Sequence, residues 1–213
     1  MRARVWVFDL DNTLHDATPH IFPHINRGMT DYLQKHLGLD REEADSLRKF
    51  YWERYGATLH GMMLHHDIKP EHFLAQTYHF PELAKMVVGE SQLRHSLRDF
   101  SGKKIVFSNA PLHYARAVLR ILRIDDLFDG VFSIEYAKFR PKPGAYGFFR
   151  IFRKMGLNPS RFIMVEDTLA NLRMAKKLGM KTVWVTDSRH RPSYVDMNVS
   201  SIRDLSRRQF IFN

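Results

Sequence analysis

The chain has 213 residues, enough for one core with a smaller accessory lobe and too few for several independent domains. With 44% hydrophobic and 26% charged residues, its composition excludes a disordered or fibrous protein. The lack of cysteine excludes a disulfide framework and a thiolate zinc site. A formal net charge of +10 favours anionic partners, either nucleic acid or a phosphate ester.

The first predicted element is a strand at residues 5–8, an apolar run of β-branched and aromatic residues typical of a strand buried on both faces. Residues 16–92 then show helical stripes and no convincing strand. The stripes are Ile25, Met29, Tyr32 and Leu33, then Ala44, Leu47 and Tyr51. An all-helical cap is therefore expected after the first strand, with Pro19, Pro23 and Gly89 near its ends.

Further apolar runs at residues 105–107, 162–165 and 182–185 predict more strands, and amphipathic helices are predicted between them. The helical stripes are Ala115, Val118, Leu119 and Leu122, then Ala145, Phe148, Phe149 and Phe152. This alternation predicts an α/β fold, a Rossmann-like doubly wound parallel sheet with helices on both faces. Residues 1–15 and 93–213 would form this core and residues 16–92 the cap, while the tail after Asp187 is basic and weakly patterned.

Polar residues follow the apolar runs, and in open α/β sheets ligands bind beyond the carboxyl ends of the strands. The residues collected in this way are Asp9, Asp11, Ser108, Asn109, Lys142, Glu166 and Asp167. Carboxylates packed together repel one another unless a cation lies among them. Oxygen ligands without cysteine or clustered histidine favour a hard cation, so Mg²⁺ is the expected cofactor.

These residue types predict phosphoryl transfer. Asp9 could attack phosphorus to form an aspartyl-phosphate, which divides one hard step into two easier ones. Asp11, on the same side of an extended segment, could protonate the leaving oxygen and later deprotonate water. Ser108 and Lys142 would hold the phosphoryl oxygens, and Pro143 suits the first turn of a helix whose N–H groups favour anions.

Four motifs, in this order, resemble those of the haloacid dehalogenase superfamily. They are Phe-Asp-Leu-Asp-Asn-Thr-Leu at 8–14, Phe-Ser-Asn-Ala at 107–110, Lys-Pro at 142–143, and Val-Glu-Asp-Thr-Leu-Ala-Asn at 165–171. The resemblance extends from residue 4 to about residue 187. It implies that Asp9 is the nucleophile and Asp11 the general acid and base, with Ser108 and Lys142 on the phosphate.

The resemblance also implies a magnesium site. Its ligands would be the carboxylates of Asp9 and Asp167 and the main-chain carbonyl of Asp11. Glu166 stands where many relatives have glycine or aspartate, and it would be an outer partner of the ion. Arg140 and Pro141 offer a second register for the third motif, but a compact lysine ammonium reaches between nucleophile and phosphate more easily than a guanidinium.

A narrower resemblance lies in the helical segment, where Tyr-Gly-Ala-Thr-Leu-His-Gly-Met at 55–62 looks like a cap segment of the pyrimidine 5′-nucleotidase branch. Lys-Leu-Gly-Met-Lys-Thr at 177–182 is also similar to that branch. This implies a nucleoside monophosphate substrate such as UMP or CMP, with Tyr55, Thr58 and His60 as cap contacts. Trp52, Tyr55 and His60 could form a wall for a base, although aromatic stripes at helical spacing are more often core.

Other functions stay open at this point. A sugar-phosphate phosphatase or a phosphomutase could use the same core, whereas Asp11 argues against a halide-releasing hydrolase, which lacks this acid. The net charge of +10 motivates a nucleic-acid-binding scaffold, but competent side chains occupy every catalytic position. His65 and His66 are expected to have surface or cap roles and not to bind metal. Without a leader or a membrane-spanning stretch, the expected location is the cytoplasm.

Overall fold

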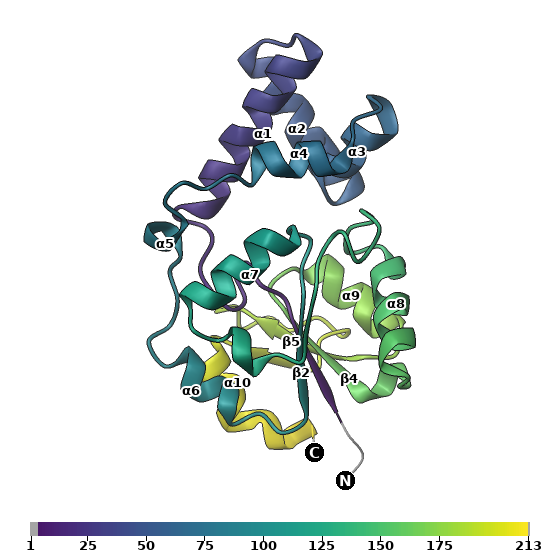
Figure 1. The fold of residues 1–213 in the computed structure, drawn as a ribbon. Helices are drawn as coiled ribbons and strands as arrows, with labels where there is room; N and C mark the ends of the chain where they lie inside the picture. Colours follow the sequence, from purple (N-terminus) through teal and green to yellow (C-terminus); the bar gives the residue numbers. More distant parts are fainter. Residues whose placement is uncertain (1–3, 213) are drawn as a thin grey trace.

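A computed structural model describes residues 4–212, which form one six-stranded sheet with a helical layer beyond its carboxyl ends (Figure 1). The strand order is β3-β2-β1-β4-β5-β6, and every neighbouring pair is parallel. The strands are β1 (Val5–Phe8), β2 (Lys103–Phe107), β3 (Gly130–Phe132), β4 (Phe162–Glu166), β5 (Lys181–Val185) and β6 (Met197–Val199). The predicted doubly wound α/β fold is confirmed.

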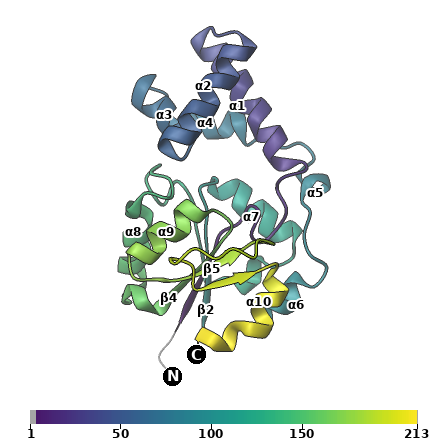
Figure 2. The same ribbon diagram turned by 180° about the vertical axis from the view of Figure 1, so that it is seen from behind.

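Successive side chains of β1 enter two different hydrophobic cores, because neighbouring residues of a strand point to opposite faces of the sheet. Trp6 and Phe8 pack in the core beneath α6 (Leu93–Arg98), α7 (Leu112–Ile121) and α10 (Ile202–Arg208). Val5 and Val7 pack in the core beneath α8 (Ala145–Met155) and α9 (Leu169–Lys177). Figures 1 and 2 show these two groups of helices on opposite sides of the sheet. Burial on both faces explains why this strand is apolar throughout.

The helical stripes beside the sheet are largely confirmed. Ala115, Val118 and Leu119 are buried on α7. On α8, Phe148 and Phe152 are buried as expected, but Phe149 is 57% exposed, so this part of the stripe was wrong. The buried face of α8 instead includes Gly147 and Ile151, which lie one turn apart beside Phe148.

The segment between β1 and β2 is helical, as predicted. Its helices are α1 (Ile21–Leu37), α2 (Arg41–Tyr55), α3 (Thr58–His65), α4 (Pro70–Thr77), α5 (Leu83–Met86) and α6. Helices α1 to α4 share their own hydrophobic cluster, which includes Leu33, Met62 and Phe73. A capping box between Asp40 and Glu43 starts α2. These four helices form the layer that faces the carboxyl ends of the strands (Figure 1).

The tail after Asp187 is more ordered than its weak pattern indicated. It adds β6 at the edge of the sheet and α10 against α6, where Ile202 and Leu205 are fully buried. Asp196 fixes this segment by accepting a hydrogen bond from the Thr182 amide at 2.9 Å. A strand of three residues is too short to show a period, which is why the sequence did not reveal it.

Short 3₁₀ helices complete the chain, namely η1 (Asp125–Leu127), η2 (Pro159–Arg161) and η3 (Gln209–Phe212). Within residues 4–212, every helix is too short or too polar to cross a bilayer. The division into a core (1–15 and 93–213) and a cap (16–92) stays a prediction, and residues 1–3 and 213 of that core lie outside the described residues.

We expect Gly61→Ala to destabilise the helical layer. A Cβ at Gly61 would lie 2.2 Å from Cγ of Tyr51, so α2 and α3 would have to move apart. The expected loss in free energy of unfolding is about 1–3 kcal/mol, as for other overpacked sites.

The matched control is Gly28→Ala in α1, where the nearest atom to the new Cβ is the Thr77 carbonyl oxygen at 3.4 Å. This change should leave stability unaltered or raise it by about 0.5–1 kcal/mol, because alanine favours a helix. Urea denaturation of both variants measures the difference. Equal stability of the two variants would show that the Gly61 contact is unimportant.

Candidate active site

A cavity of about 630 Å³ lies between the carboxyl ends of the strands and the helical layer. The sheet order places it at a topological switch point, since the chain proceeds from β1 to β2 on one side and continues with β4 on the other. Asp9, Ser108 and Asp167 line its floor, while Trp52 and His60 line it from the helical layer. The predicted catalytic residues and part of the helical segment therefore line the same cavity.

Three carboxylates meet at the floor of this cavity. Asp9 follows β1, Glu166 ends β4 and Asp167 comes next, and one oxygen from each lies within 4.8 Å of the others. Pairing of β1 with β4 brings them together, and the Asp9 amide donates to the Val165 carbonyl at 2.9 Å. The residues expected to share a cation are thus adjacent.

Lys142 inserts a buried ammonium among these groups. Its Nζ donates to Asp9 Oδ1 at 2.7 Å, to Glu166 Oε2 at 2.8 Å and to the Phe107 carbonyl at 2.9 Å. Burial opposes this charge, but the two carboxylates outweigh it and raise the pKa of Lys142. Arg140 instead places its guanidinium over the Tyr146 ring at 4.5 Å, so it is Lys142 that reaches Asp9.

The prediction that Lys142 and Pro143 open a helix is wrong. Helix α8 begins at Ala145, after Gly144 as its N-cap, and Lys142 lies in the preceding turn. This turn is closed by a hydrogen bond from the Gly144 amide to the Pro141 carbonyl at 2.8 Å. The turn, and not a helix end, directs Lys142 toward the strand ends.

Each carboxyl of the cluster has a raised pKa. Burial and then the charge of Glu166 raise the pKa of Asp9 to about 8, and burial also raises the pKa of Glu166 and Asp167. A single ammonium does not balance two buried carboxylates and the partly buried Asp167, so the donor set fits a divalent cation bound by oxygen. A bound cation would favour the ionised form of Asp9 and lower its pKa.

The hydrogen bonds of Glu166 hold neighbouring groups of the site in place. Its Oε2 accepts from Lys142 and from Asn171 Nδ2 at 3.0 Å, and its Oε1 accepts from the Thr168 amide at 3.1 Å. The side chain has no exposed surface. Both oxygens are engaged, so Asp9 and Asp167 have more freedom than Glu166 to bind an ion.

Asp11 lines the same cavity, but the chain turns after Asp9 and does not continue as an extended segment. The Leu14 amide donates to the Leu10 carbonyl at 2.9 Å, and Asn12 has a φ of 58°. The Asp11 side chain accepts from Tyr114 Oη at 2.6 Å and contacts His15 Nε2 at 2.8 Å. Neither partner was predicted from the sequence, since Tyr114 has the pattern of an ordinary buried residue of a helix.

Ser108 and Asn109 both line the cavity, but they have different partners. Ser108 is 2% exposed, and its Oγ accepts from the Ala110 amide at 3.0 Å. The Asn109 side chain makes two bonds to the Lys142 backbone, donating to its carbonyl at 3.0 Å and accepting from its amide at 2.7 Å. The Asn109 side-chain amide therefore joins the loop after β2 to the turn that carries Lys142.

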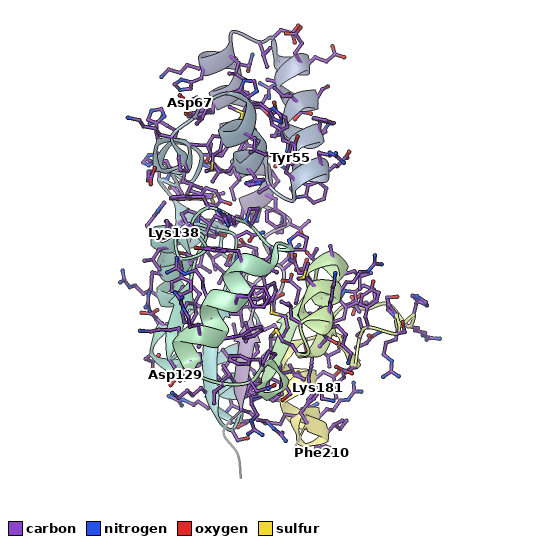
Figure 3. The ribbon with its side chains drawn as sticks, turned by 90° about the vertical axis from the view of Figure 1, so that its right-hand side faces the viewer. Tyr55, Asp67, Asp129, Lys138, Lys181 and Phe210 are labelled. Atoms are coloured by element: carbon purple, nitrogen blue, oxygen red, sulfur yellow. The ribbon has the colours of Figure 1, made fainter. Side chains whose placement is uncertain are left out.

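The predicted cap residues separate into two sets. Thr58 and His60 line the cavity, as does Trp52, which is 62% exposed. Tyr55 lies in the helical layer (Figure 3) but is not among the lining residues, because its Oη bonds to His65 Nε2 at 2.7 Å. The expected wall for a base thus lacks Tyr55.

The paired histidines lie at the end of α3, not in an extended segment. His65 bonds to Tyr55, and His66 Nε2 bonds to Tyr51 Oη at 2.7 Å.

Among residues 4–212, the only group of acidic and histidine ligands close enough for a metal is Asp9, Glu166 and Asp167. Arg48 and Lys49 also line the cavity, from α2, and they were not predicted because no motif distinguishes them in the sequence.

With this fold and site in place, comparison with known proteins identifies the class of protein. The family model of haloacid dehalogenase-like hydrolases matches residues 3–179. The chain belongs to this family of hydrolases. A curated relative, Phosphate metabolism protein 8 of Saccharomyces cerevisiae, is 25% identical over 194 residues, covering 83% of this chain and 60% of the relative. The chain thus spans less than two thirds of that protein's length.

Solved structures share the fold across nearly the whole chain. The HAD phosphatase of Thermococcus onnurineus is 22% identical with a TM-score of 0.64, and the match covers 97% of each chain. CbbY of Rhodobacter sphaeroides, in complex with phosphate, is 18% identical with a TM-score of 0.68 over 95% of this chain and 96% of its own. L-2-haloacid dehalogenase of Xanthobacter autotrophicus is 18% identical with a TM-score of 0.62 over 96% and 97%. At these identities the likeness concerns the fold alone.

We expect Lys142→Met to lower the free energy of unfolding by about 3–5 kcal/mol in EDTA at neutral pH, since it leaves buried carboxylates without their counter-charge. Adding Glu166→Gln should recover part of this loss, because one buried charge is then removed. Urea denaturation measures both effects. Lys154→Met, at an exposed position of α8, is the control, and an equal effect of the two lysine changes would contradict the buried ion cluster.

Proposed function

We propose that the chain is a Mg²⁺-dependent phosphatase that hydrolyses small phosphomonoesters and carries the phosphoryl group transiently on Asp9. The observation that carries this proposal is the position of Asp9, whose carboxylate lines the cavity, lies 2.7 Å from Lys142 Nζ and has an oxygen within 4.8 Å of one from Asp167. Its Oδ1 accepts from Lys142, which leaves Oδ2 to act on phosphorus.

In the first step Asp9 Oδ2 attacks phosphorus, and the bond between phosphorus and the ester oxygen breaks. Asp11 gives its proton to that oxygen, so the alcohol leaves neutral. In the second step water attacks the phosphorus of the aspartyl-phosphate, and Asp11 takes a proton from the water. The bond to Asp9 then breaks, which releases inorganic phosphate and restores both carboxyl groups.

Other residues hold the phosphoryl group through these steps. Ser108 Oγ–H and the Asn109 main-chain N–H can donate to its oxygens. All three Lys142 N–H bonds are already donated, so Lys142 acts on the phosphate chiefly by its charge. Mg²⁺, bound by Asp9, Asp167 and the Asp11 carbonyl, would neutralise phosphoryl charge.

For the substrate, we favour a nucleoside monophosphate, such as a pyrimidine nucleotide. The exposed ring of Trp52 together with Thr58 and His60 offers an aromatic and polar wall on the helical side of the cavity. Residues 16–92 would act as a cap that selects the substrate. The lack of cysteine supports action in a reducing compartment such as the cytoplasm.

A screen of mononucleotides and sugar phosphates tests this function. We expect phosphate release from UMP with Mg²⁺, none with EDTA, and a fall in kcat of at least about 10³-fold in Asp9→Asn. Asp16→Asn, at an exposed carboxylate in the same loop, is the matched control and should keep full activity. Release from sugar phosphates alone would discard the nucleotide preference, and an isomeric ester would indicate a mutase. No turnover of any monoester would overturn the proposal.

A further inference from the structure

We infer that Tyr114 and His15 are positioning residues for Asp11, and that they fix which of its two oxygens exchanges a proton with the substrate. The inference rests on the proposed function, in which Asp11 is the general acid and base. Neither residue belongs to the four motifs, and one of them lies on α7, far along the chain from Asp11.

Both partners converge on a single oxygen. Tyr114 Oη donates to Asp11 Oδ1 at 2.6 Å, and His15 Nε2 lies 2.8 Å from the same atom. Tyr114 and His15 are 1% and 4% exposed, whereas the Asp11 side chain keeps 15% of its surface and lines the cavity. Two donors on Oδ1 fix the carboxyl plane, so Oδ2 is the oxygen left for the substrate.

Among the described residues, Asp11 is the only polar side-chain partner of the buried His15 ring. Its Nδ1 is buried without a hydrogen-bond partner, so its one polar contact is that of Nε2 with Asp11. The favoured tautomer has the proton on Nε2, because a buried N–H without an acceptor costs more than a bare ring nitrogen. His15 is therefore a donor directed at Asp11.

The ring of Tyr114 is held in place by aromatic packing. Its ring lies 5.4 Å from that of Tyr78 and 5.3 Å from that of Phe80, and both belong to the segment that leaves the helical layer. A phenol fixed in this way donates from a set direction. Side chains locked by packing are what keeps a catalytic group within the narrow range of productive geometries.

This arrangement assigns the proton transfers to Oδ2. In the first step the proton on Oδ2 passes to the ester oxygen as the phosphorus–oxygen bond breaks. Tyr114 and His15 keep their own protons and continue to donate hydrogen bonds to Oδ1. In the second step Oδ2 takes a proton from the attacking water. Neither positioning residue gains or loses a proton, so their effect must appear through Asp11.

The test compares two substrates that differ in their need for an acid. The ribose oxygen of UMP is a poor leaving group, whereas p-nitrophenolate leaves without protonation. The value of kcat/KM reports events up to the first irreversible step, which here is formation of the aspartyl-phosphate. We expect Tyr114→Phe and His15→Leu to lower the ratio of kcat/KM for UMP to that for p-nitrophenyl phosphate by at least about 10-fold.

Three controls make the result specific. Asp11→Asn should lower the same ratio further. His15→Gln, whose amide can replace Nε2, should restore it toward the unmodified value. Tyr136→Phe removes a partly buried phenol that donates to the Arg150 carbonyl at 3.1 Å and packs against the core on the other face of the sheet from Tyr114, and it should leave the ratio unchanged. If Tyr114→Phe fails to fold, the two His15 variants carry the test.

Two outcomes would overturn the inference in distinguishable ways. If Asp11→Asn lowers the ratio while Tyr114→Phe and His15→Leu affect both substrates equally, the proposed function stands and the positioning role falls. If the unmodified protein turns over neither substrate, the proposed function falls and takes the inference with it.

Discussion

The site depends on one interaction, the burial of the Lys142 ammonium between Asp9 and Glu166. It ties a turn near residue 142 to the ends of two paired strands, and Asn109 fixes the same turn from the end of β2. Removing one member of such a cluster leaves an uncompensated buried charge, which is strongly destabilising. The Asp9 carboxylate is thus held in position by its ion pair with Lys142.

Much of this organisation could be predicted because it is encoded locally. An apolar run followed by a polar residue marks a buried strand and its carboxyl end, and parallel pairing brings such ends together. That reasoning identified Asp9, Ser108, Asn109 and Asp167, which all line the one cavity. The outer role expected for Glu166 stays a prediction, and both of its oxygens accept hydrogen bonds within the protein.

The features that escaped prediction depend on contacts without a local pattern. Tyr114 reaches Asp11 across 103 positions of the chain, and nothing in the helical stripe around it indicates a polar task. Phe149 fits a helical period yet faces solvent, because period alone does not fix which edge of a stripe meets the sheet. The Tyr55 hydroxyl bonds to His65 and does not line the cavity, and this partner is visible only in the tertiary structure.

The place of β1 in the sheet has a consequence for biosynthesis. Residues 5–8 pair only with residues 103–106 and 162–165, so β1 has no partner strand until much of the chain that follows it has been synthesised. Helices α1 to α4, by contrast, pack largely with one another and can associate while the sheet is still incomplete. The ion cluster of Asp9, Lys142, Glu166 and Asp167 therefore cannot assemble before β4 has been synthesised, late in the translation of this chain.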